Sequence, residues 1–529
     1  MTHPVSPAAP GARVTFGLLD EAGAGRVLDA ALERLEAVGV VPACGEAREA
    51  LMTAGARGAG DETLRLDGDR AMAAAAAAPE RVVLGDRGGA GETVLLAGAG
   101  LLAAGGQPAA RVHSGGETHG ATAADLIDAC RLADALPDVA VVAAPPVQTD
   151  AAVGRVVHGS PGVPGGPEGT GGAGVAGDAA ASDVVMARDG ASPLAGAAVT
   201  LRTTAKHLLV VGVTSATEAV ALCRMAAVLR GDDEDLRRRP PLSLLGGAGS
   251  FAAALTFARA GLPAGALVET PAGAAGRGLT DPAGTAPADR APAVSTSADR
   301  GGAVTDALVR YLADVLAANA AVQGAAPGAA FVAPVCPALA GLPATGPETT
   351  AFMVAATQVL ARAGLPAAAG AFATSAPGVD WKAGTEGSFA VLACLMAGAA
   401  LVTGAGTLCG GADFSPAQLV ADAEIHSWCA KVAAGIPVDE ETLAVDVIRQ
   451  VDACGNFLGQ KHTRRHMKDV WRPRLLDRTA WDAWVAGGRK GAAEKAVELA
   501  GTLLAQHEVA LLDAETEAKL QRIIATAGL

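Results

Sequence analysis

The sequence lacks the short motifs by which many enzyme classes are recognised. Its eight cysteines form no CxxC pair, so neither a zinc knuckle nor a redox dithiol is predicted, and we expect no metal site of the chain's own. It also contains no nucleophile elbow, Walker loop, dinucleotide-binding fingerprint or catalytic triad. The cysteines are spread through apolar segments, which predicts buried thiols in a reducing cytosol.

Basic and aromatic side chains are scarce as well. The chain has 41 Lys and Arg against 55 Asp and Glu, and the resulting net charge of −14 would repel nucleic-acid phosphates. Only 3% of the residues are aromatic, so alanine accounts for much of the 50% hydrophobic content. The N-terminal residues have neither the basic nor the apolar segment of a signal peptide. We therefore expect a cytoplasmic protein with no nucleic-acid partner.

The longest uncharged stretch has 26 residues, from 387 to 412. A run of this length is enough to cross a bilayer. Ala, Gly and Thr dominate it, however, and such residues insert poorly into membranes. We therefore interpret it as a buried helix over about 383–397 followed by a buried strand over about 399–404, and we expect no membrane segment.

Strands and helices are predicted to alternate through most of the chain. One example is the apolar run 207–214, a predicted strand, which is followed by a predicted helix at 216–230. A further helix is predicted at 303–319. Because each parallel crossover needs a helix, the alternation predicts an α/β fold, a TIM (β/α)₈ barrel. The predicted division is an N-terminal helical cap at 1–90, the barrel at 91–480 and C-terminal helices at 481–529.

Two segments interrupt this alternation. Residues 159–174 and 270–302 are rich in Gly, Pro and Ala and show no periodicity. Both are predicted to be mobile insertions or linkers. An active-site lid is the alternative interpretation of the second segment.

The loop before the uncharged run carries the chemistry that we favour. Asp380 and Trp381 stand where a predicted strand passes into a helix, and Lys382 and Glu386 follow in its first turns. A parallel barrel keeps its active site at such junctions. Lys382 is a candidate Schiff-base lysine, with an exposed lysine at a helix start as the simpler interpretation. Trp381 can present its ring face to a cation, or else pack in a core or an interface.

Three other motifs give weaker signals. In DAEIHSWCAK (422–431), His426 lies near two carboxylates, a group that could hold a metal but lacks the compact HExxH spacing. HSGGETHG (113–120) places two histidines beside a glutamate on a glycine-rich turn, which we interpret as a loop that braces the next helix. KHTRRH (461–466) predicts a solvated basic face, with a partner-facing patch as the alternative.

A series of segments along the chain carries a resemblance. They are LERLEAVGV, GATAADLIDACRLADALPDV, TTAKHLL, RRRPPLS, AAPGAAF, GPETTAF, GLPAAAG, KAGTEGSFAVLACLMAGAALVTGAGTL, SPAQLVADAEI, GIPVDEETLAVDVI and GNFLGQKHTRRH. In this order, nearly end to end, they resemble the trimethylamine methyltransferase family of corrinoid-protein-dependent methyltransferases. The fold of that family is a TIM barrel, which agrees with the alternation.

The resemblance implies a methyl transfer from a quaternary or other N-methylated small amine, such as a betaine, to Co(I) of a corrinoid (cobalamin) carried by a partner protein. Founding members of the family carry pyrrolysine at a position that corresponds here to about Ala373. This chain has none, so it resembles the non-pyrrolysine branch, which acts on quaternary amines such as glycine betaine. A quaternary nitrogen leaves as a neutral amine, so positioning dominates catalysis.

The resemblance also implies which residues form the site. The candidate cation cage and the position beside it are Phe372, Ala373, Trp381 and Phe389. The candidate catalytic residues are Glu386, Asp380 and Lys382. His426 or an arginine is the candidate for a substrate carboxylate. The family usually has Gln where this chain has Lys382, so its charge needs a carboxylate of the protein or of the substrate as partner.

Two alternatives stay open. One is a TIM-barrel enzyme of another class that uses Lys382 as a Schiff-base lysine. The other is a non-catalytic binder of small molecules. The leading hypothesis predicts a methylamine or betaine substrate and a cognate corrinoid protein as partners, and we also expect a homo-oligomer.

Overall fold

The computed structural model describes residues 17–59, 62–105, 111–114, 117–145, 192–268, 300–340, 342–343, 345–451 and 455–527. The predicted insertion 159–174 lies outside the described residues, as does nearly all of the predicted insertion 270–302. The expectation that these segments are mobile, or that one forms a lid, therefore stays a prediction.

Eight parallel strands form the centre of the described structure. They are neighbours in chain order, and the last of them, β14, pairs with the first, β5. Their bounds are β5 Leu101–Ala104, β8 Val139–Ala144, β9 His207–Val211, β10 Leu242–Leu245, β11 Ala264–Gly265, β12 Ala333–Val335, β13 Ala367–Ala369 and β14 Leu401–Ala405.

The barrel closes between β11 and the residues just before β12. A parallel bridge joins Ala264 to Phe331. The amide of Ala264 donates to the carbonyl of Ala330 at 3.1 Å, and the amide of Val332 donates to the carbonyl of Ala264 at 3.1 Å. The strands therefore form a closed TIM barrel, as the alternation predicted.

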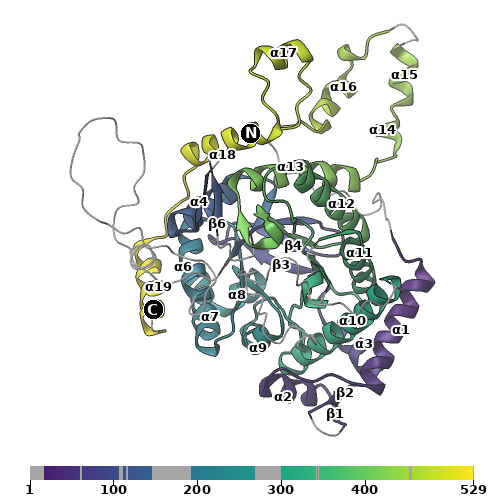
Figure 1. Ribbon diagram of the computed structural model, residues 1–529, viewed down its shortest axis with the longest axis vertical. Helices are drawn as coiled ribbons and strands as arrows, with labels where there is room; N and C mark the ends of the chain where they lie inside the picture. Colours follow the sequence, from purple (N-terminus) through teal and green to yellow (C-terminus); the bar gives the residue numbers. More distant parts are fainter. Residues whose placement is uncertain are drawn as a thin grey trace, which may run out of the picture.

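In the described part of the chain, a long helix follows each barrel strand, and these helices surround the barrel (Figure 1). One core lies between strands and helices and a second lies among inward-facing strand residues. No helix of the described residues has the length and apolar character needed to cross a bilayer. The helices are α4 Ala123–Ala135, α6 Pro193–Thr203, α7 Ala216–Arg230, α9 Phe251–Arg259, α10 Arg300–Ala325, α11 Pro347–Arg362, α12 Trp381–Ala397 and α13 Pro416–Ala433.

Several predicted elements are confirmed closely. The helix predicted at 216–230 is α7. The helix and strand predicted from the uncharged run, at 383–397 and 399–404, are α12 and β14. Both helices start with a side-chain cap. Ser215 accepts a hydrogen bond from the backbone amide of Glu218, and Asp380 accepts one from the backbone amide of Ala383. Local capping and apolar periodicity therefore sufficed to place these elements.

A hairpin fills the amino-terminal end of the barrel. Its strands, β3 (Val82–Gly85) and β4 (Glu92–Leu95), pair antiparallel. Gly85 donates its amide at 2.8 Å to the carbonyl of Pro240, which precedes β10. Three apolar side chains of the hairpin share a core with inward-facing barrel residues, and they are Val82, Leu84 and Leu95. A ligand therefore has to enter from the carboxyl end.

Smaller elements cover the outside of the barrel. Helices α1, α2 and α3 pack against α10, while α18 packs against α13 and α4, and α19 against α7 and α6. The predicted boundaries between cap, barrel and C-terminal helices stay predictions. The bounds are α1 Glu21–Ala37, α2 Gly45–Thr53, β1 Arg57–Gly58, β2 Leu64–Arg65, α3 Gly68–Ala77, α8 Asp233–Arg238, α18 Ala492–Gln506 and α19 Ala514–Thr526.

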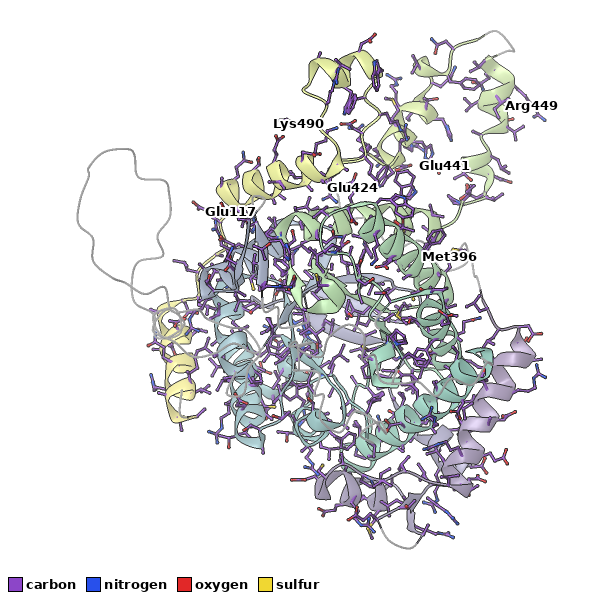
Figure 2. The ribbon with its side chains drawn as sticks, viewed as in Figure 1. Glu117, Met396, Glu424, Glu441, Arg449 and Lys490 are labelled. Carbon is purple, nitrogen blue, oxygen red and sulfur yellow. The ribbon has the colours of Figure 1, made fainter. Side chains whose placement is uncertain are left out.

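An arm, defined as residues 435–451 and 455–490, projects from the body of the molecule (Figure 1). Figure 2 places Glu441, Arg449 and Lys490 on it, away from the barrel. The arm touches the body where Arg474 donates its amide at 2.8 Å to Glu424 of α13. Its helices are α14 Glu440–Leu443, α15 Val445–Val451, α16 Lys461–His466 and α17 Trp481–Ala486.

Replacing Gly265 with alanine should weaken the closure of the barrel. A Cβ atom there would lie 1.8 Å from the carbonyl oxygen of Val332, so the two strands must move apart. We expect the free energy of unfolding to fall by about 1–3 kcal/mol, measured by urea denaturation.

Gly25→Ala is the matched control. Its Cβ atom would meet nothing within 4 Å on α1, so this variant should gain up to about 1 kcal/mol of stability from the higher helix propensity of alanine. Equal denaturation midpoints for Gly265→Ala and the wild type would contradict the tight contact at the closure.

Candidate functional site

Small residues line the carboxyl end of the barrel. Ala368 and Leu401 face the barrel interior, so side-chain alternation also turns Gly370 and Thr403 inward. Both are half-buried. A Cβ atom on Gly370 would have two heavy atoms within 4 Å, the Val335 carbonyl oxygen at 3.7 Å and Thr403 Oγ1 at 4.0 Å. A methyl group at Gly370 would therefore make only ordinary van der Waals contacts.

Glu386 holds the loop that follows β13. It lies in the second turn of α12 and accepts a hydrogen bond from Thr374 Oγ1 at 2.6 Å. It also accepts from the amide of Ser375 at 2.9 Å and from its hydroxyl at 3.0 Å. Three donors on one carboxylate fix the path of the loop at the carboxyl rim.

Asp380 and Lys382 flank the start of α12. Asp380 caps the helix by accepting the Ala383 amide at 3.0 Å. Lys382 is exposed, and its Nζ lies 3.4 Å from the carbonyl oxygen of Ser375. The structure thus brings the three candidate catalytic residues to one loop. It gives Lys382 none of the burial that activates a Schiff-base lysine.

The chain after β14 joins this loop. Cys409 donates its amide to the Ala376 carbonyl at 3.0 Å, and Gly410 donates to the Thr374 carbonyl at 2.7 Å. Cys409 has φ of 51°, a left-handed conformation that is uncommon for residues other than glycine. The strands on either side of this turn are β15 Thr407–Leu408 and β16 Asp413–Phe414, which pair antiparallel.

A hairpin from the first part of the chain completes the same layer. Its strands are β6 Arg111–Ser114, which pairs parallel with β16, and β7 Glu117–Gly120. Asp413 accepts hydrogen bonds from Arg111 Nε at 3.0 Å and Nη2 at 2.9 Å, and His113 Nε2 lies 2.7 Å from its Oδ2. Loops that follow β5, β13 and β14 therefore meet at one rim.

Asp413 is buried yet charged. Burial alone would raise its pKa, but hydrogen bonds from Arg111, then His113 and Cys409, outweigh burial and hold the pKa of Asp413 below its ordinary value. The same hydrogen bond raises the pKa of the Arg111 guanidinium. Burial, followed by the bond to Asp413, raises the pKa of the Cys409 thiol. At neutral pH the pair is thus ionic and the thiol is protonated.

The three candidate cage rings do not share a surface in the described structure. Phe372 is fully buried beneath Gly387 of α12, whose Cβ position lies 3.3 Å from the ring. Trp381 and Phe389 are 84% and 72% exposed on α12. Ala373 is half-buried on the rim loop, next to Phe372.

His426 lies at the opposite end of the barrel. Its Nε2 is 2.7 Å from the carbonyl oxygen of Gly100, the residue before β5. Burial lowers the pKa of the imidazole, so the neutral ring donates to this carbonyl. A ligand at the carboxyl rim is out of its reach, and we leave His426 out of the proposed site.

The remaining motif residues have structural partners. His119 Nε2 lies 3.1 Å from Asp125, which belongs to the capping box of α4. Glu424 accepts from the guanidinium of Arg474 at 3.2 Å. Within the described ranges, no three His, Cys, Asp or Glu side chains form a group that could hold a metal ion.

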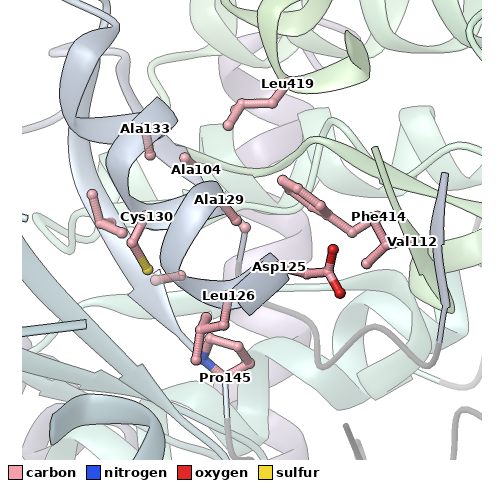
Figure 3. Close-up of a pocket in the computed structure, with 13 residues that line it drawn as sticks. Ala104, Val112, Asp125, Leu126, Ala129, Cys130, Ala133, Pro145, Phe414 and Leu419 are labelled. Carbon is pink, nitrogen blue, oxygen red and sulfur yellow. The ribbon is translucent and has the colours of Figure 1, made fainter. Parts of the chain in front are cut away.

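A small cavity lies beside the rim layer. It measures about 40 Å³ and lies between α4 and the ends of β5 and β8 (Figure 3). Val112 and Phe414 line it together with Leu126 of α4. The lining of the cavity is mostly apolar, which does not suit a charged substrate.

Sequence reasoning missed Arg111, Cys409 and Asp413. The turn GGADFS at the end of the uncharged run contained a usable signal, because Asp413 is the first charge after 26 neutral residues. A charged side chain directly behind a buried strand needs a partner. The pairing of β6 with β16, which supplies Arg111, could not be read from either segment alone.

A model of the trimethylamine methyltransferase family matches residues 288–527. The match covers less than half of the 529 residues, so it shows a similarity of this part of the chain to that family. The matched part contains β12, β13 and β14 together with the rim loop held by Glu386. The resemblance noted in the first half of the sequence lies outside the matched residues.

The curated relatives match over less than half of their own length. The trimethylamine methyltransferase of Methanosarcina barkeri is 37% identical over 182 residues, which are 34% of this chain and 37% of that protein. The glycine betaine methyltransferase of Desulfitobacterium hafniense (strain Y51) is 32% identical over 223 residues, 41% of this chain and 46% of that protein. The solved monomethylamine methyltransferase of M. barkeri covers 94% of this chain and 90% of its own, with a TM-score of 0.44 and 11% identity, too distant to compare individual residues.

Asp422 of α13 should make the stability of the protein fall as pH rises. Burial raises the pKa of its carboxyl to about 8, against the opposing hydrogen bonds from the Gly406 amide and Gln418. The folded state keeps a proton that the unfolded chain releases at lower pH. The stabilisation is therefore complete in acid and is lost as pH rises towards 8.

Asp422→Asn should remove this pH dependence. The side-chain amide of the new asparagine can accept a hydrogen bond from the Gly406 amide and donate one to Gln418 Oε1, which has no partner among the described residues. Its melting temperature relative to the wild type should rise between about pH 5 and about pH 8. Asp134→Asn is the contrasting control, because Thr204 and His507 outweigh burial and lower the pKa of Asp134, so that variant should lose stability at neutral pH. A constant offset between Asp422→Asn and the wild type would contradict the buried neutral acid.

Proposed function

We propose that this protein moves a methyl group from a quaternary or other N-methylated small amine, of the betaine type, to Co(I) of a corrinoid carried by a partner protein. One observation carries the proposal: the family-matched segment supplies the loop with Glu386, and that loop stands at the carboxyl end of the barrel. Relatives of this segment are methyltransferases for trimethylamine and glycine betaine.

The residue at the pyrrolysine position favours a quaternary substrate. This chain has Ala373 there, a side chain with no chemistry to offer an amine. A tertiary amine would have to leave as an amide-like anion unless its nitrogen were activated. A quaternary nitrogen leaves as a neutral amine and keeps the electron pair of the broken C–N bond. We therefore place the protein in the non-pyrrolysine branch of the family.

The chain's own residues would act by positioning. The carboxylate of Glu386, fixed by Thr374 and Ser375, puts negative charge at the rim, which suits a cationic substrate. Gly370 and Thr403 leave room below the rim and fit an approach of the corrinoid from above. The corrinoid would supply the reduced metal that accepts the methyl group.

The cytosol is the proposed compartment. The seven cysteines among the described residues are free thiols. Unpaired thiols persist in reducing compartments.

Methyl transfer should depend on the space beside Gly370. We expect the absorbance of cob(I)alamin to decay when the wild type is given glycine betaine or another substrate from a panel of methylated amines. Gly370→Leu should abolish both the decay and substrate binding, because its side chain fills the inward space next to Thr403. The melting temperature of Gly370→Leu should equal that of the wild type, because a Cβ atom at Gly370 makes no close contact.

Gly370→Ala is the matched control and should retain transfer. Wild-type rates in Gly370→Leu would contradict the site. Betaine binding in calorimetry without any methyl transfer would favour the non-catalytic binder instead. A borohydride-trapped adduct on Lys382 would favour the Schiff-base alternative.

We also propose a homo-oligomer in which the arm contacts a second copy. Ile436 and Val438 are large apolar residues exposed on the arm. Residues 461–478 carry seven Lys and Arg against two Asp in a chain whose net charge is −14, so their charge complements that of another copy.

The double variant Ile436→Ser, Val438→Ser should lower the molar mass measured by light scattering, because it removes apolar contact area from the arm. Arg449→Gln is the control on the same arm and should leave the mass unchanged. A wild type that is monomeric, or a double variant with unchanged mass, would contradict the proposal.

A further inference from the structure

Arg111 presents unused hydrogen-bond donors to solvent at the rim. Its side chain is 57% exposed, whereas that of Asp413 is 1% exposed. The ion pair uses Nε and Nη2 of the guanidinium. Nη1 and the second hydrogen of Nη2 have no acceptor among the described residues. A guanidinium bound through one edge can bind another carboxylate through its second edge.

Arg111 lies on the face of β6 that is opposite to the small cavity. Val112 faces α4, where it lines the small cavity with Phe414 (Figure 3). Alternation along β6 therefore turns Arg111 to the opposite face. That face adjoins the rim loop, because the turn that leads to Asp413 is hydrogen-bonded to Ala376 and Thr374.

The guanidinium is fixed before any ligand arrives. Asp413 holds it through two hydrogen bonds, and His113 approaches the same carboxylate at 2.7 Å. His113 is itself placed by Thr118, whose Oγ1 lies 3.1 Å from Nδ1. A side chain that is already ordered loses little conformational entropy on binding, so its contacts give more affinity.

We propose that Arg111 binds the carboxylate of a zwitterionic, betaine-type substrate, while the Glu386 side of the rim faces its ammonium group. The inference rests on the proposed function and narrows it, because it selects carboxylated quaternary amines over simple methylamines. Arg111 is then a specificity-determining residue, and Asp413 is the positioning residue behind it.

The test compares two ligands by calorimetry, glycine betaine and tetramethylammonium, which carries the cation without a carboxylate. Arg111→Gln should weaken binding of glycine betaine about 10- to 100-fold, as expected for loss of hydrogen bonds to a charged group, and leave tetramethylammonium unchanged. Arg111→Lys keeps the positive charge, so its affinity for glycine betaine should lie between those of the wild type and Arg111→Gln. Arg449→Gln, on the arm far from the rim, should match the wild type (Figure 2).

The outcomes separate this inference from the proposed function, because calorimetry needs no methyl acceptor. If Arg111→Gln weakens the binding of both ligands equally, or of neither, the carboxylate site is overturned. Methyl transfer to cob(I)alamin by the wild type would then still support the proposed function. The carboxylate site is also overturned if the wild type binds tetramethylammonium as tightly as glycine betaine. A wild type that neither binds nor demethylates any methylated amine overturns the proposed function and the inference with it. If Arg111→Gln strongly lowers the melting temperature, the two ligands are compared with Arg111→Lys instead, because this variant keeps the ion pair with Asp413.

Discussion

The closure of the barrel is the constraint on which the rest of the structure depends. Backbone hydrogen bonds between Ala264 and the residues on either side of Phe331 turn an open sheet into a ring. In a closed ring of parallel strands, every carboxyl end points the same way. Because β5 pairs with β14 and β14 with β13, residues near 111, 375 and 410 are neighbours at that end, although long stretches of chain separate the first from the others.

One buried charge organises this rim. Asp413 loses its hydration on folding, and an unpaired carboxylate there would cost several kcal/mol, about what a buried ion pair loses when one partner is removed. Arg111, His113 and the Cys409 thiol compensate for that loss, so the requirement of Asp413 for partners draws β6 onto β16. Glu386 has the corresponding role on the neighbouring loop, where it accepts hydrogen bonds from Thr374 and Ser375.

The sequence predicted the architecture better than the site. Caps and apolar periodicity are local, so α7, α12 and β14 were placed closely, and barrel topology then put Glu386 at the carboxyl end of the barrel. His426 lies away from the rim because α13 runs back towards the amino end, and three turns of helix carry a residue about 16 Å from the rim. The exposure of Phe389 depends on which face of α12 packs inward, and the burial of Phe372 depends on the contact of its loop with Gly387. The bond between Arg111 and Asp413 spans 302 residues, beyond what any local pattern can indicate.

The flanking helices cross over the ring. The N-terminal helices pack on α10, in the later half of the barrel, whereas α18 packs on α13 of the later half and on α4 of the earlier half, and α19 packs on α6 and α7 (Figure 1). The C-terminal helices therefore bridge the two halves of the barrel, which also meet where β5 pairs with β14. Such cross-bracing leaves no half-barrel able to detach by itself, so the molecule should come apart as one cooperative unit, and a fragment limited to the family-matched residues would expose its core.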